Sequence, residues 1–142
     1  IHKLGGKAMD GLYATMTVQN PYLDEASQPI RFWASKYKTK FNEDPTVFSV
    51  YGYTIISSFA VAANKAGKNL TTDSFIKVMD NLTIEPDFFG GAVQTFSATK
   101  RLGSDASRLS QIQDGKWKTV SDYFGSTAKP AAAPAAKAPA KK

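Results

Sequence analysis

The sequence predicts a mixed α/β protein in which one strand is followed by three helices and then by strands that end in a β-hairpin. Three observations support this prediction: an alternating segment at Gly11–Val18, helical apolar spacing in three segments between residues 27 and 82, and an Asp-Gly turn within residues 109–120. Three successive helices break the β-α alternation of a complete doubly wound domain. The chain is therefore either a small α+β unit or pieces of a larger α/β fold.

Composition and charge divide the chain in two. Of its 142 residues, 42% are apolar and 21% charged, as in a globular protein of one domain. The net charge is +6, but four lysines follow Ala128 without any acidic residue, and removing these four leaves +2 for residues 1–128. We expect a folded unit over residues 1–125 and a disordered Ala/Pro/Lys tail over residues 126–142.

The first strand is predicted from alternation at Gly11–Val18. One face carries Leu12, Ala14, Met16 and Val18. The strand is expected to end at Asn20-Pro21, because proline cannot donate to a ladder and asparagine favours a turn.

Three helices are predicted next. The first begins at about Ser27 with Pro29 in its first turn, and its apolar stripe is Ile30, Trp33, Ala34, Tyr37 and Phe41. The second runs over Thr46–Ala66, and a third begins at about Thr72 with Thr72 or Asp73 as its cap.

The second helix carries no charge between Asp44 and Lys65, so it is either a core helix or a membrane span. Its Ser, Thr, Gly, Asn and Tyr content is too high for a span. Because it is apolar nearly all round, we expect burial on most of its circumference.

The later strands are predicted from glycine and turn signals. Asp87–Ala98 is expected to be extended, with a bend or close approach at Gly90-Gly91. Asp114-Gly115 suits the two positive-φ positions of a type I′ turn, so Leu109–Gln113 and Lys116–Val120 form a hairpin.

Residues for catalysis are scarce. The only histidine is His2 and there is no cysteine. The close acidic pairs lie at helix starts or loops, where solvation and the helix dipole account for them. We expect neither catalytic residues, nor a metal site, nor a cofactor, and hence no enzyme.

Six segments in this order carry a family resemblance: GLYATMTVQNPY, ASKYKTKFNEDP, TVFSVYGYTIISSFAVAANKAG, DSFIKVMDNL, FFGGAVQTFSATKRLGSDAS and QIQDGKWKTV. Together they resemble the C-terminal portion of periplasmic ligand-binding proteins of branched-chain amino acid (Leu/Ile/Val-binding) ABC importers. The resemblance covers about residues 5–123 and leaves out the tail. One departure is Gly90-Gly91-Ala92, which stands where the family has a Gly-Pro turn.

The resemblance implies the C-terminal part of a two-lobed type I periplasmic-binding-protein clamshell, with pieces of both lobes in residues 1–125. The chain would be roughly the last third of the whole protein. It would cross between lobes near Gln19–Tyr22, with Asn20 and Pro21 as hinge residues, and return near Thr83–Gly90 as a second hinge segment.

The resemblance also implies ligand-contacting residues. In the family the start of the helix that matches Thr46–Ala66 faces the interlobe cleft, which makes Phe48 the first candidate and Tyr51 the second. Tyr22, beside the crossing, is the third, and Tyr53 is assigned to structure. The competing interpretation of Phe48 is core packing, the commoner role of a Phe on a buried helix.

The implied function is the substrate-binding component of an ABC importer, which closes about a hinge on a small solute, an amino acid or a related organic acid or amide. Its partner would be an ABC permease of the inner membrane. Its location would be the periplasm or, through a lipid anchor, the cell surface, after removal of a signal peptide.

Two alternatives remain: a ligand-sensing receptor domain of the same fold, and a small basic nucleic-acid-binding protein acting through its tail. The charge of +2 outside the tail argues against nucleic acid as a partner. The family's groups for the charged ends of the ligand lie before Ile1. We therefore expect no measurable solute affinity for the isolated chain.

Overall fold

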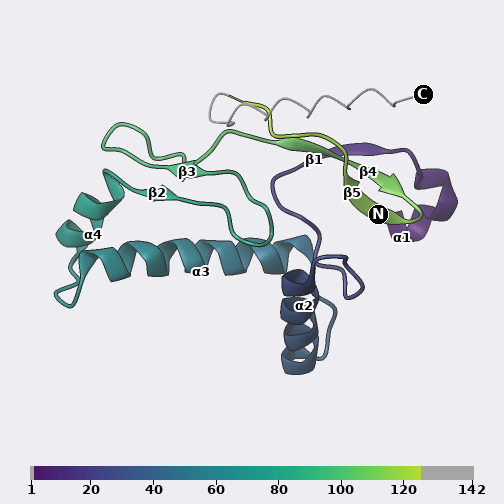
Figure 1. Cartoon of the computed structure of the whole chain (residues 1–142), viewed down its shortest axis with the longest axis horizontal. Helices are drawn as coiled ribbons and strands as arrows, with labels where there is room; N and C mark the ends of the chain where they lie inside the picture. The colour runs from purple at the N-terminus through teal and green to yellow at the C-terminus, as the bar shows by residue number, and fades with distance from the viewer. Residues whose placement is uncertain (1, 126–142) are drawn as a thin grey trace, which may run out of the picture.

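The computed structural model describes residues 2–125, so the predicted tail at 126–142 lies outside the described residues. The elements form two groups, which we call the sheet lobe and the helix lobe (Figure 1). The sheet lobe contains α1 (His2–Gly5), η1 (Gly6–Met9), β1 (Tyr13–Met16), β4 (Arg108–Gln113) and β5 (Lys116–Thr119). The helix lobe contains α2 (Gln28–Phe41), α3 (Val47–Ala66), α4 (Thr72–Met79), β2 (Thr83–Ile84) and β3 (Gln94–Thr95).

The sheet lobe is built on an antiparallel sheet with the order β1-β4-β5. The predicted hairpin is confirmed: Asp114 (φ 54°) and Gly115 (φ 71°) occupy the two positive-φ positions of the turn. The predicted alternation of β1 is confirmed as well, because Ala14 pairs with Ser110 and Met16 pairs with Arg108 on one face of the sheet.

The helices begin close to the predicted residues. Ser27 is the N-cap of α2, with Pro29 in the first turn, and Asn42 ends this helix in the left-handed conformation (φ 54°). Before α3, the Thr46 N–H donates to Ser49 Oγ at 3.1 Å. The predicted caps of α4 were wrong: the N-cap is Thr71, whose Oγ1 accepts from the Ser74 N–H at 3.2 Å. Thr71 precedes the helical turn and can offer its oxygen to that N–H, whereas Thr72 and Asp73 already lie inside it.

An aromatic cluster forms the core of the helix lobe at the start of α3. Phe89 is fully buried with Ile30 and Val50. The Trp33 and Phe89 rings meet edge-on with centroids 5.0 Å apart, and the Tyr53 ring lies 5.7 Å from both. Tyr53 is thus a structural residue, in agreement with its assignment from the sequence.

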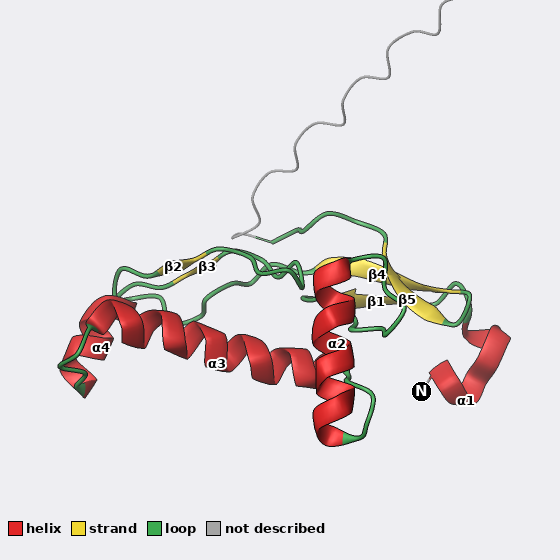
Figure 2. Ribbon diagram, turned by 60° about the horizontal axis from the view of Figure 1, so that its bottom comes forward, coloured by secondary structure: helices red, strands yellow, loops and turns green. Residues whose placement is uncertain are grey.

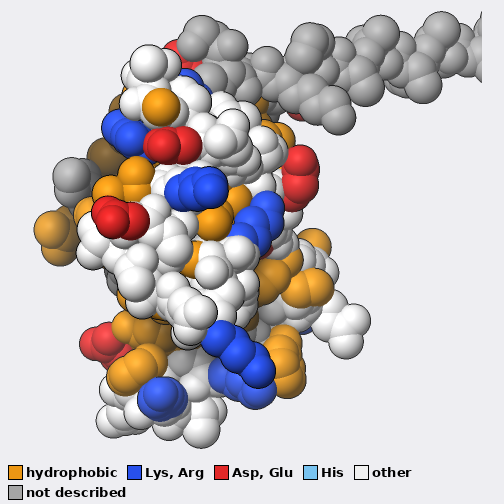
Figure 3. Space-filling view, turned by 90° about the vertical axis from the view of Figure 1, so that its left-hand side faces the viewer, with side chains coloured by type: hydrophobic (Ala, Val, Ile, Leu, Met, Phe, Trp, Pro, Cys, Tyr) orange, Lys and Arg blue, Asp and Glu red, His pale blue; other side chains and the backbone are white. Residues whose placement is uncertain are grey.

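The expected burial of α3 was wrong for this chain. Only Val50 and Ala62 of this helix are buried, while Ile55, Ile56 and Phe59 are 66%, 67% and 53% exposed. Figures 2 and 3 show the reason: α3 extends beside the β2–β3 ribbon with α4 only at its end, and apolar side chains reach the surface there. By length and composition alone α3 also qualifies as a membrane span, which is weak support for one. Among residues 2–125, α4 contacts the end of this helix, where the Phe59 and Phe75 ring centroids lie 5.3 Å apart, while Ile55 and Ile56 stay exposed.

The two lobes are joined by two segments, residues 17–27 and 96–107 (Figure 1). The first agrees with the crossing expected near Gln19–Tyr22. The expected return at Thr83–Gly90 was wrong, because β2 pairs with β3 inside the helix lobe and the chain rejoins the sheet only after β3. Residues 85–93 instead form a loop that reaches the crossing, where the Gln19 N–H donates to the Phe89 carbonyl at 2.9 Å.

Candidate functional site

A cavity of about 820 Å³ lies between the two lobes beside the first crossing. Three parts of the chain line it. The sheet lobe contributes Met9, Leu12, Ala14, Met16, Ile112 and Trp117. The crossing contributes residues 20–24, and the turn into α3 contributes residues 44–48. A cavity with walls on both lobes changes shape whenever the lobes move relative to each other.

Four of the five residues predicted from the sequence meet at this cavity. Phe48 and Tyr22 line it, as do Asn20 and Pro21. Phe48 is 77% exposed although it stands on an apolar helix, so its ring does not contribute to the core. Other apolar side chains of α3 are exposed as well, so the binding role of Phe48 stays a prediction.

Tyr51 does not line this cavity. Its hydroxyl accepts a hydrogen bond from Thr17 Oγ1 at 3.3 Å, and it lines a separate cavity of about 300 Å³ under the loop at Leu102–Ser104. The Tyr51 ring does contact Phe48, with centroids 6.0 Å apart. In this arrangement Tyr51 supports the Phe48 side chain.

Sequence reasoning missed Trp117 and Ile112 as lining residues. They are cross-strand partners on β5 and β4, on the sheet face that also carries Ala14 and Met16. The alternation of Gly11–Val18 gave a signal for that face, but nothing local indicated that the hairpin would extend it. Trp117 thus lies opposite Ile112 in the hairpin and also lines the cavity.

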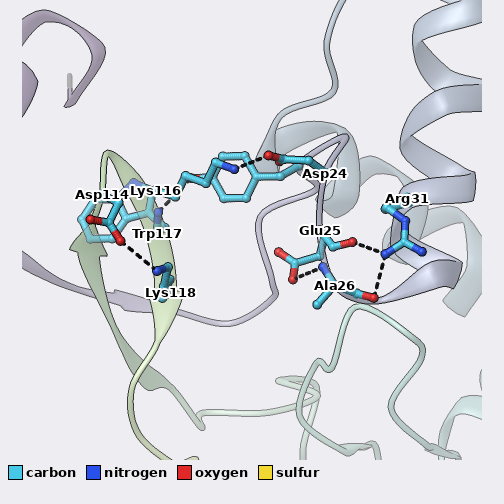
Figure 4. A network of polar contacts seen from close by, with 9 residues as sticks. Asp24, Glu25, Ala26, Arg31, Asp114, Lys116, Trp117 and Lys118 are labelled. Carbon is cyan, nitrogen blue, oxygen red and sulfur yellow. Dashed lines mark hydrogen bonds and ion pairs between the residues drawn. The ribbon is translucent and has the colours of Figure 1, made fainter.

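A polar network joins the first crossing to the hairpin at the edge of the cavity (Figure 4). Lys116 forms an ion pair with Asp24, and its Nζ lies 5.6 Å from the centroid of the Tyr22 ring. The Tyr22 hydroxyl accepts from the Trp117 N–H at 2.8 Å. We call these four residues the crossing clasp, because they tie the start of the crossing to the sheet lobe.

The electrostatics of the crossing clasp follow from these contacts. The Lys116 ammonium lowers the pKa of the Asp24 carboxyl, and Asp24 in turn raises the pKa of Lys116. Burial raises the pKa of the Tyr22 phenol, so the hydroxyl stays neutral. Beyond the clasp, Arg31 Nη1 donates to the carbonyls of Glu25 and Ala26 and fixes the turn into α2 (Figure 4).

The charged groups of the cavity are few and paired. Its two carboxylates are Asp24, bound to Lys116, and Asp44, whose Oδ1 lies 2.9 Å from Lys38 Nζ. No Lys, Arg or His is among the lining residues, and no group of His, Asp and Glu in the described part of the chain could hold a metal ion. The cavity is thus an apolar surface with aromatic walls, suited to holding a molecule.

Comparison with known proteins gives the family. The family model described as "Periplasmic binding protein" matches residues 1–116. No curated protein matches the chain.

Two solved structures share the fold. One, from Rhodospirillum rubrum, is assigned to a branched-chain amino acid ABC transporter; it is 20% identical, with a TM-score of 0.59 over 83% of this chain and 33% of that one. The other is a branched chain amino acid ABC transporter from Thermus thermophilus with bound valine; it is 16% identical, with a TM-score of 0.61 over 87% of this chain and 36% of that one. This chain therefore spans about a third of the length of each.

The match over residues 1–116 and the shared fold agree with the division into two lobes around a cavity. The chain belongs to the periplasmic binding protein family.

Proposed function

We propose that this chain forms part of the substrate-binding component of an ABC importer, which holds a small solute between two lobes and has no enzymatic activity. The observation that carries the proposal is the cavity of about 820 Å³ between the lobes, with the exposed Phe48 ring at its wall. Concave, mostly apolar sites at the junction of two lobes are typical of small-molecule binding.

The lining indicates which part of the solute this chain would contact. The walls are apolar and aromatic, and the carboxylates at the edge already have lysine partners. Burying a charged end of a solute against such a surface costs free energy. We infer that Phe48, Trp117 and Met16 contact the uncharged body of an amino acid or of a related organic acid or amide. Residues outside this chain would bind the charged ends.

Closure of the lobes would complete the site. The first crossing supplies Asn20 and Pro21 as hinge residues, and both also line the cavity. A solute that contacts both lobes stabilises the closed form, because only that form allows both sets of contacts. The closed form is then the one that an inner-membrane permease would recognise, in the periplasm or at a lipid-anchored location.

The open apolar face of α3 agrees with this proposal. A helix with Ile55, Ile56 and Phe59 exposed requires a cover in a globular protein. Since this chain covers only 33% and 36% of the two matched structures, the remainder of such a protein would provide that cover.

The test is Phe48→Ala in the protein expressed from its complete coding sequence, with solute affinity measured by calorimetric titration. Burying an exposed Phe ring is worth about 1.5–3 kcal/mol, so the Kd should rise roughly tenfold to a hundredfold. The control is Phe32→Ala on α2, which removes another exposed ring (62%) that does not line the cavity. Equal affinities for both variants and the parent would overturn the proposal for Phe48.

A further inference from the structure

Arg108, the first residue of β4, is the one charged side chain that is buried in the described part of the chain, with 9% of its surface exposed. Its guanidinium carbon lies 4.9 Å from the centroid of the Tyr123 ring, a cation–π contact. Its Nε and Nη2 atoms have no hydrogen-bond partner among residues 2–125, and no ion pair forms at this side chain there. A buried cation without a carboxylate is costly, so its position calls for an explanation beyond filling space.

Tyr123 connects the segments between the lobes. Its hydroxyl oxygen lies 2.6 Å from the carbonyl oxygen of Thr17, in the first crossing, and 2.6 Å from that of Gly90, in the loop after β2. The phenol has one proton for these two acceptors, so they share it or alternate. Burial raises the pKa of Tyr123, which keeps this proton in place.

Arg108 lies against the same loop. A Cβ atom built on Gly90 would stand 3.5 Å from both Nη1 and Nη2 of Arg108, and Gly90 adopts a positive φ of 65°. The neighbouring residue Ser107 is fixed to Phe124 by backbone hydrogen bonds in both directions. The Arg108 side chain, the Tyr123 ring and the Gly90 backbone therefore meet where the two lobes are joined.

This arrangement differs from an ordinary ion pair in one respect. A bidentate pair with a carboxylate would fix the guanidinium in a single orientation. Contact with a ring face has no such directional bonds, so it can persist while the segments rotate a little. The shared phenolic proton can likewise move from one carbonyl to the other.

We propose that Arg108 and Tyr123 are positioning residues of the interlobe junction, which set the balance between the open and closed forms without touching the solute. Neither residue lines the cavity of about 820 Å³. The inference rests on the proposed function for its effect on solute affinity, but its effect on lobe separation can be measured without any solute.

The test measures lobe separation in the protein expressed from its complete coding sequence. The chain has no cysteine, so spin labels at Ser35→Cys on α2 and Thr119→Cys on β5, both exposed positions, report on the two lobes by double electron–electron resonance. Tyr123→Phe and Arg108→Met should each shift the solute-free distance distribution and change the Kd of the bound solute by about threefold or more. Arg108→Lys keeps the charge but loses the planar guanidinium group. Its distance distribution should therefore lie between that of the parent and that of Arg108→Met.

Two matched controls separate positioning from packing. Tyr13→Phe and Lys68→Met likewise remove a phenolic oxygen and a positive charge, but at exposed side chains outside the two segments that join the lobes. Both should leave the distance distribution unchanged. An unshifted distribution in Tyr123→Phe, with or without a lower melting temperature, overturns the inference and leaves Arg108 and Tyr123 as core packing. If Arg108→Met does not fold, Tyr123→Phe, which removes one oxygen atom, decides alone.

The two proposals fail in different ways. If the parent protein binds no solute, the proposed function fails, while the distance distributions still decide on Arg108 and Tyr123. If solute binds but neither distance nor Kd responds to the variants, this inference alone fails.

Discussion

The Tyr22 hydroxyl accepts a hydrogen bond from the Trp117 backbone N–H at 2.8 Å, across 95 positions of the sequence. This contact joins the crossing between the lobes to the hairpin of the sheet lobe, and both residues line the cavity. The position of the Trp117 ring is therefore tied to the segment that we propose as the hinge.

Trp117 should report solute binding by its fluorescence. The chain has only one other tryptophan, Trp33, which packs in the core against Phe89. We expect a saturable change in tryptophan emission when the complete protein is titrated with its solute, because the environment of Trp117 changes on closure. Trp117→Phe should remove the part of this emission change that comes from Trp117. An emission change of the same amplitude in Trp117→Phe would contradict the prediction that Trp117 reports solute binding.

Phe89→Ala should be among the most destabilising single substitutions in the helix lobe. Phe89 is fully buried among Trp33, Tyr53 and Phe88, so its removal leaves a large cavity. The expected loss in the free energy of unfolding is about 3–5 kcal/mol, measured by denaturant titration. Phe41→Ala, which removes a 54% exposed ring at the end of α2, is the control and should cost much less. Equal losses would contradict the position of the core.

Two glycine substitutions should have opposite signs. Gly52→Ala lies within α3, where an added Cβ meets no atom within 4 Å, so it should stabilise the chain by about 0.5–1 kcal/mol. Gly115→Ala also meets no atom, but its φ of 71° is strained for alanine, so it should destabilise by about 1–2 kcal/mol. Melting temperatures of the two variants test the prediction: a rise for Gly115→Ala would contradict the turn geometry, and a fall for Gly52→Ala would contradict the open space at that position of α3.

Alkaline pH should weaken the fold through Tyr22 and Tyr123. Burial raises the pKa of both phenols above the ordinary value of 10.0. Groups whose folded-state pKa is raised contribute stability that is complete below the unfolded pKa and is lost as pH rises through the folded pKa. The free energy of unfolding should thus fall above about pH 10. Tyr123→Phe should reduce the slope of the free energy of unfolding against pH above about pH 10. Phenolate absorbance should show one fewer group that ionises late. An unchanged slope would contradict the burial of Tyr123.

Local signals made much of the fold predictable. The Asp114-Gly115 turn, the start of α2 after Ser27 and the alternation that became β1 all depend on residues within one turn or strand. The cap of α4 was missed by one residue because Thr71, Thr72 and Asp73 are all acceptable caps in sequence, and only the path of the chain selects Thr71.

Long-range contacts explain what the sequence did not show. The return to the sheet at Thr83–Gly90 was taken from the family resemblance, whereas the burial of Phe89 against α2 and α3 holds residues 85–93 as a loop in the helix lobe. Trp117 and Arg108 are positioned by residues far away in the sequence: Tyr22 bonds Trp117 across 95 positions, and Met16 pairs with Arg108. No local pattern encodes such contacts. Phe48 and Tyr22 were named as candidate ligand-contacting residues through the family resemblance alone. The residues next to them in the sequence suit core packing equally well.

The exposure of α3 follows from the same limitation of local patterns. Composition correctly marks α3 as a helix that requires cover on several sides, but it does not say which part of a protein provides that cover. Within this chain, α2 and residues 88–89 cover the start of the helix and α4 contacts its end.

The most direct test of the central claim compares calorimetric titrations of the complete protein and of the 142-residue chain with a panel of amino acids and their amides. The account predicts saturable one-site binding to the complete protein and no measurable heat with the chain alone, because the chain supplies only one part of the cleft wall. The absence of binding to the complete protein across the panel would contradict the proposed solute class. Tight binding to the chain alone would contradict the view that residues outside it complete the site.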